Sequence, residues 1–523
     1  MAVGKEEQQQ VVSVKRRSVL KAGLAIPIAT SGAAAAMMNG CASMSDSTDD
    51  LTALSAAAAA RQINDGSLSA EKYASHLLAR YESTRGFNAV TWINKDRVLE
   101  SARRVDVMRG NGEKLGPLAG LPVALKDNID AIGFPTTGGT PVLEVNLPKQ
   151  NAQVVNLLLQ NGAYVFGKTN MHELAKGATS SNMGYGAVRN PIDQKRIPGG
   201  SSGGSAAALA AGFVPLALGT DTAGSARIPA ALCGVAGFRP SISITGRRKL
   251  YSDQGVLPLA LDLDTIGPLA RSVEDIALVH SVVTGSALHK LTSLKGIRIG
   301  VPRAYFYENL EPGVQRVIEQ ALLKLHSEGV VLVDIDLGDF ARSAAKMNLT
   351  IFEISVRTDL EQYLASRQIG MTAAGLIDGI RSPDVKAFYK RLSAINATPQ
   401  MIAHVRNVAR PQLAKVYEDT LRANDVNFIA FPTEPIVAPF IKEGGDLAED
   451  SSGKRDPQAL ALIRNTCTAA VVGAPGVTIP AGRTVEGLPV GLEFDGISGA
   501  DNALLSFALA VEKVLAVPPG APV

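Results

Sequence analysis

Short apolar runs of strand length alternate with helix-like segments along most of this chain. The runs at 121–129, 162–169 and 297–302 are short and mostly apolar, whereas 59–84 and 311–329 repeat apolar residues at helical spacing. Strands without polar alternation are typical of sheets that helices cover on both faces. The alternation therefore predicts an α/β protein. With 46% hydrophobic residues, the 523-residue chain has enough apolar material for a large core.

The first 49 residues have the pattern of an export signal rather than of a folded element. Basic residues at 15–17, two of them arginines, precede a weakly apolar run over 22–38, and a polar stretch follows. The run is short and rich in glycine and alanine, and Pro27 interrupts it, which argues against a membrane-spanning helix. The pattern resembles a twin-arginine signal, so we expect a periplasmic or envelope-associated protein.

Cysteine usage and charge exclude several classes of protein. Cys41 follows the apolar run and is either a lipid attachment site, which would tie the protein to the membrane, or an incidental cysteine. With Cys233 and Cys467 it makes three cysteines, from which no disulfide framework can be derived, and no cysteine–histidine cluster has metal-ligand spacing. A net charge of +3 does not favour nucleic-acid binding.

The segment 198–225 combines a glycine- and serine-rich loop, an alanine-rich run, a buried-strand pattern and a second loop of small residues. Gly-Ser composition ordinarily indicates a flexible linker, but a linker would not be enclosed between an apolar helix and an apolar strand. Glycines ahead of a helix let backbone N–H groups converge on an anion or on a developing oxyanion. A phosphate-binding P-loop is excluded, because the loop lacks Gly-Lys-Ser or Gly-Lys-Thr.

A serine nucleophile in this segment allows two interpretations. Residues 199–203 match the G-x-S-x-G nucleophile elbow, with Ser201 as the nucleophile. Pro198 disfavours the strand that must lead into such an elbow, and no downstream histidine has a marked acidic partner. The second interpretation uses a base other than histidine.

Lys126 is the candidate for that base. The apolar run before it would carry the amine into a desolvated interior, where the pKa of a lysine falls. Neutralising an ordinary lysine at pH 7 costs roughly 4.6 kcal/mol, which burial can supply. The alternative is a lysine that ends a strand in solvent or pairs with Asp127 or Asp130.

Three motifs together, at 120–141, 167–191 and 197–241, resemble the amidase signature family. The resemblance covers roughly residues 55–510, and its details are most similar to indoleacetamide and mandelamide hydrolases. It implies a single catalytic domain over 50–520, following the leader at 1–49, with a variable and partly helical substrate-side region at 290–430. The implied fold is α/β/α, with one large mixed sheet covered by helices on both faces.

The resemblance implies a Ser-Ser-Lys triad. Lys126 matches the base, Ser201 matches a bridging serine, and Ser225 matches the nucleophile, so the elbow serine becomes a relay. The peptide bond Gly200–Ser201 is expected to be cis, as in the family. No metal ion or organic cofactor is implied.

The same resemblance places an oxyanion hole at the backbone N–H groups of Thr222, Ala223, Gly224 and Ser225. The family usually has glycine at the position of Ala223. The alanine keeps the N–H group but restricts the backbone, so it affects the geometry of the oxyanion donors and not the identity of the nucleophile. Two loop serines are weaker candidates for contacts with the acyl group of the substrate, with a purely structural role as the alternative: Ser180 and Ser181.

Other residues of the motifs are expected to be structural. Asp221 and Arg227 form an ion pair that orients the nucleophile loop, and Ser202 and Ser205 cap the following helix or hold the loop. Cys233 is expected in the core. His172 is expected to anchor a helix over 170–174 rather than to act as a base. Four aromatic residues either line a pocket or pack in the core or in a surface loop: Tyr251, Tyr305, Phe306 and Tyr307.

The implied function is hydrolysis of a carboxylic amide through an acyl-enzyme on Ser225. A small aryl or arylalkyl amide is the favoured substrate, with peptide, fatty acyl and urethane bonds as alternatives. A protein like the catalytic subunit of glutamyl-tRNA amidotransferase would need cytoplasmic partners and tRNA, against which the export signal argues. An exported binding protein would not need the intact triad. The oligomeric state stays open, a homodimer included.

Overall fold

The computed structural model describes residues 50–245, 247–442 and 457–520. The twin-arginine pattern and Cys41 fall within 1–49 and so lie outside the described residues, as do 246, 443–456 and 521–523. None of the helices in the described ranges combines the length and the apolar character needed to cross a bilayer.

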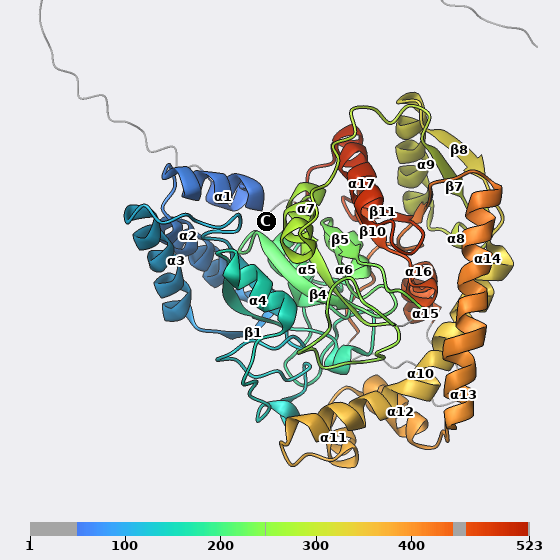
Figure 1. The fold of residues 1–523 in the computed structure, drawn as a ribbon, viewed down its shortest axis with the longest axis horizontal. Helices are drawn as coiled ribbons and strands as arrows, with labels where there is room; N and C mark the ends of the chain where they lie inside the picture. Colours follow the sequence, from blue (N-terminus) through green and yellow to red (C-terminus); the bar gives the residue numbers. More distant parts are fainter. Residues whose placement is uncertain (1–49, 246, 443–456, 521–523) are drawn as a thin grey trace, which may run out of the picture. The chain divides into compact units, whose positions relative to one another are not determined.

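Eleven strands form one mixed sheet in the order β1-β3-β2-β4-β6-β5-β10-β11-β9-β7-β8 (Figure 1). The pairs β2–β3, β2–β4, β7–β8 and β7–β9 are parallel, and the other neighbours are antiparallel. The predicted α/β class is confirmed, with a large mixed sheet and helices on both faces. The strands are β1 (Val90–Ile93), β2 (Pro122–Lys126), β3 (Tyr164–Thr169), β4 (Leu216–Asp221), β5 (Ala236–Arg239), β6 (Thr265–Ala270), β7 (Arg298–Val301), β8 (Val331–Asp334), β9 (Phe428–Pro432), β10 (Gly476–Arg483) and β11 (Pro489–Asp495).

Helices occupy most of the connections between the strands. Gly-Ser at 66–67 separates α1 from α2, as the interrupted helical pattern predicts. The α-helices are α1 (Ala56–Asp65), α2 (Ala70–Ser83), α3 (Lys95–Gly110), α4 (Gln153–Gln160), α5 (Gly203–Ala210), α6 (Arg227–Cys233), α7 (Val273–Thr284), α8 (Arg303–Phe306), α9 (Pro312–Ser327), α10 (Gly338–Arg367), α11 (Ala373–Gly379), α12 (Pro383–Ser393), α13 (Pro399–His404), α14 (Arg410–Ala423), α15 (Pro457–Arg464), α16 (Cys467–Val472) and α17 (Asp501–Leu515). Short 3-10 turns lie at Leu51–Ala53, Arg85–Phe87, Pro141–Leu143 and Glu173–Ala175, and a π-helical turn at Val405–Ala409 joins α13 to α14.

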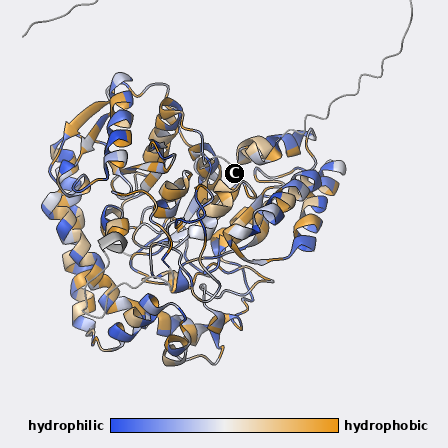
Figure 2. Ribbon diagram, turned by 180° about the vertical axis from the view of Figure 1, so that it is seen from behind, coloured by the Kyte–Doolittle hydropathy of each residue, from blue (hydrophilic) through white to orange (hydrophobic). Residues whose placement is uncertain are grey.

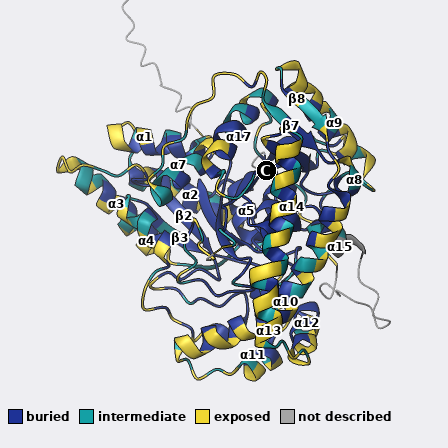
Figure 3. Ribbon diagram, turned by 45° about the vertical axis from the view of Figure 1, so that its right-hand side comes forward, coloured by how far each residue is buried: buried dark blue, intermediate teal, exposed yellow. Residues whose placement is uncertain are grey.

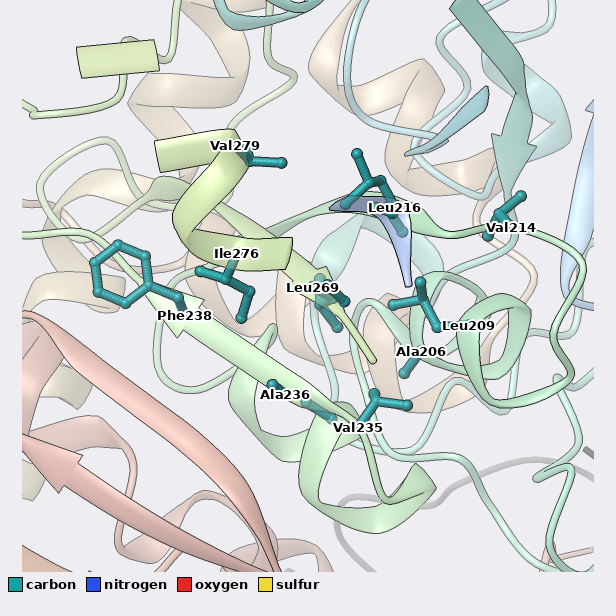
Figure 4. Close-up of a cluster of buried hydrophobic side chains, with 14 of the residues drawn as sticks. Ala206, Leu209, Val214, Leu216, Val235, Ala236, Phe238, Leu269, Ile276 and Val279 are labelled. Carbon is teal, nitrogen blue, oxygen red and sulfur yellow. The ribbon is translucent and has the colours of Figure 1, made fainter. Parts of the chain in front are cut away.

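The centre of the sheet is fully buried, which fixes the strands that carry the predicted site. Every residue of β2, β4 and β6 is buried. All eight residues of α5 are buried too, because its small side chains let the helix pack closely on β2, β3 and β4. Figure 4 shows Leu216 of β4 and Leu269 of β6 within an apolar cluster that also holds Leu209 of α5 and Ile276 of α7.

The helical region α10–α14 packs beside the sheet and joins none of its strands. Its helices are amphipathic: Figure 2 shows apolar and polar residues alternating along them, and Figure 3 shows exposed residues along one side of α14. Ion pairs between partly exposed arginines of this region and buried carboxylates tie it to the loops that leave the sheet. Arg406 bonds to Asp262 at 2.7 Å, and Arg367 pairs with Asp130. The region is therefore coupled to the loops around the predicted site.

Candidate active site

The amine of Lys126 is fully buried at the end of β2. Its Nζ lies 2.7 Å from Ser201 Oγ and 2.8 Å from Thr220 Oγ1, and none of the residue is exposed. Burial lowers the pKa of Lys126 from 10.5 to about 7, and the carboxylates of Asp264 and Asp221 oppose this shift only in part. Near neutral pH a large fraction of the amine is therefore uncharged and can accept a proton.

The alternative partners of Lys126 are occupied elsewhere. Asp127 lies 3.1 Å from the Nζ of Lys168 in a fully buried ion pair. Asp130 pairs with Arg367 of α10. The interpretation of Lys126 as a solvent-exposed or Asp-paired lysine is therefore wrong.

Ser201 is buried between two segments of the chain. The Gly200–Ser201 peptide bond is cis, which confirms that prediction. The carbonyl of Ser201 accepts a hydrogen bond from the N–H of His172 at 3.1 Å. The side chain is thus held against Lys126 while the main chain is held by the loop at 170–184.

Ser225 lies in the loop between β4 and α6. The N–H of Ser202 donates to the carbonyl of Ser225 at 3.1 Å, so the two serine-bearing segments run side by side. Gly224 has φ +119°, and a Cβ there would overlap the side chain of Thr466, so this turn requires glycine. Ser225 is 8% exposed, and no hydrogen bond among the described residues uses its Oγ. Its hydroxyl is therefore not held by another group of the described chain.

The carboxylate of Asp221 holds the loop that carries Ser225. It accepts from the N–H of Gly224 at 3.0 Å and of Ala226 at 3.2 Å, and it lies 3.0 Å from both Arg227 and Arg239. Burial alone would raise the pKa of Asp221, but the two guanidinium groups hold it well below its usual range. The Asp221–Arg227 pair is structural, as predicted.

The predicted oxyanion donors differ in their availability. The N–H of Gly224 already donates to Asp221, so the expectation that it helps to form the hole is corrected. Over residues 50–245, 247–442 and 457–520, no hydrogen bond uses the N–H of Thr222, Ala223 or Ser225. Three donors therefore remain for an oxyanion.

Ala223 keeps a defined backbone orientation although the family usually has glycine there. The side chain of Thr466 donates to the carbonyl of Ala223 at 2.6 Å. The side chain of Thr222 donates to Asp264 at 2.7 Å. The peptide after Ala223 is thus fixed by a hydrogen bond, and the side chain of the residue before it is held by Asp264.

The loop serines divide into two kinds. Ser180 is structural, because its Oγ accepts from the N–H of Gly203 at 3.1 Å. Ser181 is 2% exposed, and its Oγ has no hydrogen-bond partner in the described part of the chain. Ser202 and Ser205 do not cap α5; their hydroxyls bond across to β4, at Thr220 and Leu218. The expectation that they hold the loop is the correct one.

The remaining residues are buried or packed as expected. Cys233 is fully buried, and burial raises the pKa of its thiol. Tyr251 lies in the core beside His280. His172 does not begin a regular helix as predicted; a 3-10 turn follows it, and its ring bonds to Asp384.

Sequence analysis missed Thr220, Asn128 and Thr466. Thr220 is the only hydroxyl residue in β4, which could have marked it as a partner for a buried amine. Asn128 donates to Thr220 Oγ1 at 3.2 Å and follows Lys126 by two residues. Thr466 carried no such signal, because it lies 241 residues after Ser225 in the sequence and only the fold brings the two together.

Known proteins give matches over most of the chain. A family model described as Amidase matches residues 73–505. Mandelamide hydrolase of Pseudomonas putida is 36% identical over 84% of this chain and 87% of its own, and indoleacetamide hydrolase of Agrobacterium vitis is 35% identical over 84% and 92%.

Solved structures also match most of the chain. Native peptide amidase from Stenotrophomonas maltophilia gives a TM-score of 0.75 at 28% identity, covering 89% of this chain and 98% of that one. The fold is therefore shared with this solved amidase. The chain belongs to the amidase family, and it is an enzyme that hydrolyses the C–N bond of amides.

Proposed function

We propose that Lys126, Ser201 and Ser225 carry out this hydrolysis as a proton relay. The observation that carries the proposal is the fully buried Nζ of Lys126, 2.7 Å from Ser201 Oγ. An amine with a pKa near 7 is matched to general-base work at neutral pH. The N–H of Ser202 bonds to Ser225, which supports proton transfer between the two serine segments.

In the proposed reaction, neutral Lys126 takes the proton of Ser201, and Ser201 takes that of Ser225. Ser225 Oγ then attacks the amide carbonyl carbon, forming a C–O bond and an oxyanion. The N–H groups of Thr222, Ala223 and Ser225 receive this oxyanion, each worth about 3 kcal/mol by analogy with other oxyanion holes. Ser201 protonates the leaving nitrogen, and the C–N bond breaks. Water then attacks the ester by the same relay, which releases the acid and restores Ser225.

A small aryl or arylalkyl amide is the proposed substrate class. Ala223, beside the nucleophile, belongs to an apolar cluster that includes Tyr305, Phe306 and Phe431. Such a cluster suits an aromatic acyl group, and the buried hydroxyl of Ser181 offers a polar contact. The names of the mandelamide and indoleacetamide hydrolases support the same class.

A panel of amides tests this assignment. We expect ammonia release from phenylacetamide, mandelamide and indoleacetamide with kcat/KM at least tenfold above that for acetamide, because burial of a ring contributes about 2 kcal/mol or more. Equal values for acetamide would contradict the aryl preference. Activity found only as glutaminyl transfer with added partner proteins would contradict a free-standing hydrolase.

We also propose export by the twin-arginine route, which the basic residues and apolar run of 1–49 support. Replacing Arg16 and Arg17 together by lysine should leave the protein in the cytoplasm, as fractionation of expressing cells would measure. Lys15→Arg is the matched control and should be exported normally. Export of the double variant at the level of the unchanged chain would contradict the proposal.

A further inference from the structure

The loop at 170–184 wraps around the segment that carries Ser201. The N–H of His172 donates to the carbonyl of Ser201, and Ser180 Oγ accepts from the N–H of Gly203, each at 3.1 Å. Gly200 packs so closely that a Cβ there would lie 2.8 Å from the nitrogen of Thr179. The position of this loop therefore determines the position of Ser201.

The loop holds three non-glycine residues in left-handed backbone conformations. Leu174 has φ 50°, Ala175 has φ 57° and Ser180 has φ 59°. Each such conformation costs free energy and persists only where the surroundings enforce it.

The imidazole of His172 lies inside the loop and is 1% exposed. Its Nδ1 accepts the N–H of Ser180 at 3.2 Å, and its Nε2 lies 3.0 Å from Oδ2 of Asp384. A Cβ on Gly177, whose φ is +151°, would overlap the ring. The ring is thus packed on one side and bonded at both nitrogens.

The carboxylate of Asp384 selects the state of this ring. An ionised carboxylate can only accept, so Nε2 must carry the hydrogen. In the neutral ring Nδ1 then keeps the lone pair that receives Ser180. In the other tautomer an Nδ1–H would face the N–H of Ser180, which would lose its acceptor, and only the hydroxyl of Thr179, 3.2 Å from Nδ1, could accept from it.

We propose that Asp384, from helix α12 in the helical region, is a positioning residue for Ser201 and acts through His172. The inference rests on the proposed role of Ser201 as the proton relay. It makes the helical region part of the catalytic apparatus, although Asp384 itself does not touch the substrate.

Helix α12 has a second attachment that is independent of Asp384. The carboxylate of Glu173 accepts from the N–H of Arg381 at 3.1 Å and of Ser382 at 2.7 Å, at the start of the helix. Removing the acceptor at 384 should therefore leave the helix in place. This allows the role of the hydrogen bond to be tested separately from the docking of α12.

The test compares Asp384→Leu, which cannot accept a hydrogen bond, with Asp384→Asn, which can. We expect Asp384→Leu to lower kcat for phenylacetamide between about tenfold and about 100-fold with KM little changed, because a small displacement of a reacting group has this effect. Asp384→Asn should stay within about threefold of the unchanged enzyme, because its amide oxygen replaces Oδ2. Lys386→Met, which removes an exposed contact of α12 to Asp378, is the matched control and should change neither constant.

The 15N shifts of the His172 ring provide a readout that does not depend on activity. They should report the Nε2–H tautomer in the unchanged enzyme and a loss of that state in Asp384→Leu. An unchanged kcat in folded Asp384→Leu, or equal losses in the Leu and Asn variants, would overturn the inference. If Asp384→Leu does not fold, an Nδ1–H tautomer in the unchanged enzyme would overturn it. Full activity of Ser201→Ala would instead overturn the relay itself.

Discussion

Replacing Lys126 by methionine should abolish amide hydrolysis and yet make the protein more stable at pH 7. The variant loses the general base, so kcat should fall by about 10²-fold to 10⁴-fold. The stability gain follows from the pKa of about 7, some 3.5 below the ordinary 10.5, since each unit corresponds to 1.36 kcal/mol. At pH 7 the burial of Lys126 therefore lowers the free energy of unfolding by about 4 kcal/mol. The variant regains this amount but loses about 2 kcal/mol with the hydrogen bonds to Ser201 and Thr220, so we expect a net gain of about 2 kcal/mol.

The difference in stability between the unchanged enzyme and Lys126→Met should depend on pH. The pKa of Lys126 is lower in the folded state, so the unfolded chain binds more protons between about pH 7 and pH 10.5. The stability of the unchanged enzyme should therefore rise relative to Lys126→Met over this interval, and the advantage of the variant should shrink. Thermal unfolding of both proteins at pH 7 and pH 9.5 measures it.

Lys168→Met is the matched control for this experiment. Lys168 is equally buried, but it is paired with Asp127. Its removal leaves the buried carboxylate of Asp127 without a counter-charge and should destabilise the protein by about 3–5 kcal/mol. Equal destabilisation by the two substitutions would show that Lys126 is a charged structural lysine, and the proposed base would be wrong.

The strands around the site were predictable because their sequence signals are local. Uninterrupted apolar runs at 121–126 and 216–219 end in polar residues, and the structure places both as central strands of the sheet. The resemblance to the amidase signature then selected Lys126, Ser201 and Ser225 from many lysines and serines. Apolar patterning alone left Lys126 open to a solvent-exposed alternative.

The errors in the sequence analysis concern contacts that join distant segments. Ser202 and Ser205 were expected either to cap α5 or to hold the loop, and only the second alternative is correct, because the neighbouring β4 lies close enough to take their hydroxyls. Gly224 was expected to supply an oxyanion donor, but Asp221 folds back under the loop and takes its N–H. In each case a tertiary partner replaced the local one.

The helical region was the least readable part for a related reason. Its amphipathic helices were apparent as a helical and polar stretch. A period of 3.6 residues indicates which face of a helix is buried, but it does not identify the element against which that face packs. The sequence analysis did not single out Asp384, which lies in the first turn of α12, and it expected His172 to anchor a helix. Only their approach in space, over 212 residues of sequence, connects the region to Ser201.

Replacing Ser225 by alanine should remove covalent labelling by a fluorophosphonate and reduce amide hydrolysis by at least about 10⁴-fold, because no nucleophile remains. Ser201→Ala should keep Ser225 as a target but deprive it of the group that takes its proton. Labelling should then be slower by about 10²-fold to 10⁴-fold and still occur at Ser225, as mass spectrometry of the labelled peptide would show.

The two alanine variants also decide between the two serine interpretations of 198–225. In a nucleophile elbow Ser201 would be the residue that is labelled, so the label would persist in Ser225→Ala and disappear in Ser201→Ala. Ser205→Ala is the matched control: its hydroxyl bonds to Thr169 and to the carbonyl of Leu218, and it makes no hydrogen bond to Lys126 in the described part of the chain. Its loss should cost about 1 kcal/mol of stability and leave the labelling rate nearly unchanged. A label that stays on Ser201 would reverse the order of the relay, and the buried amine of Lys126 would then activate the nucleophile directly, at the 2.7 Å contact already formed.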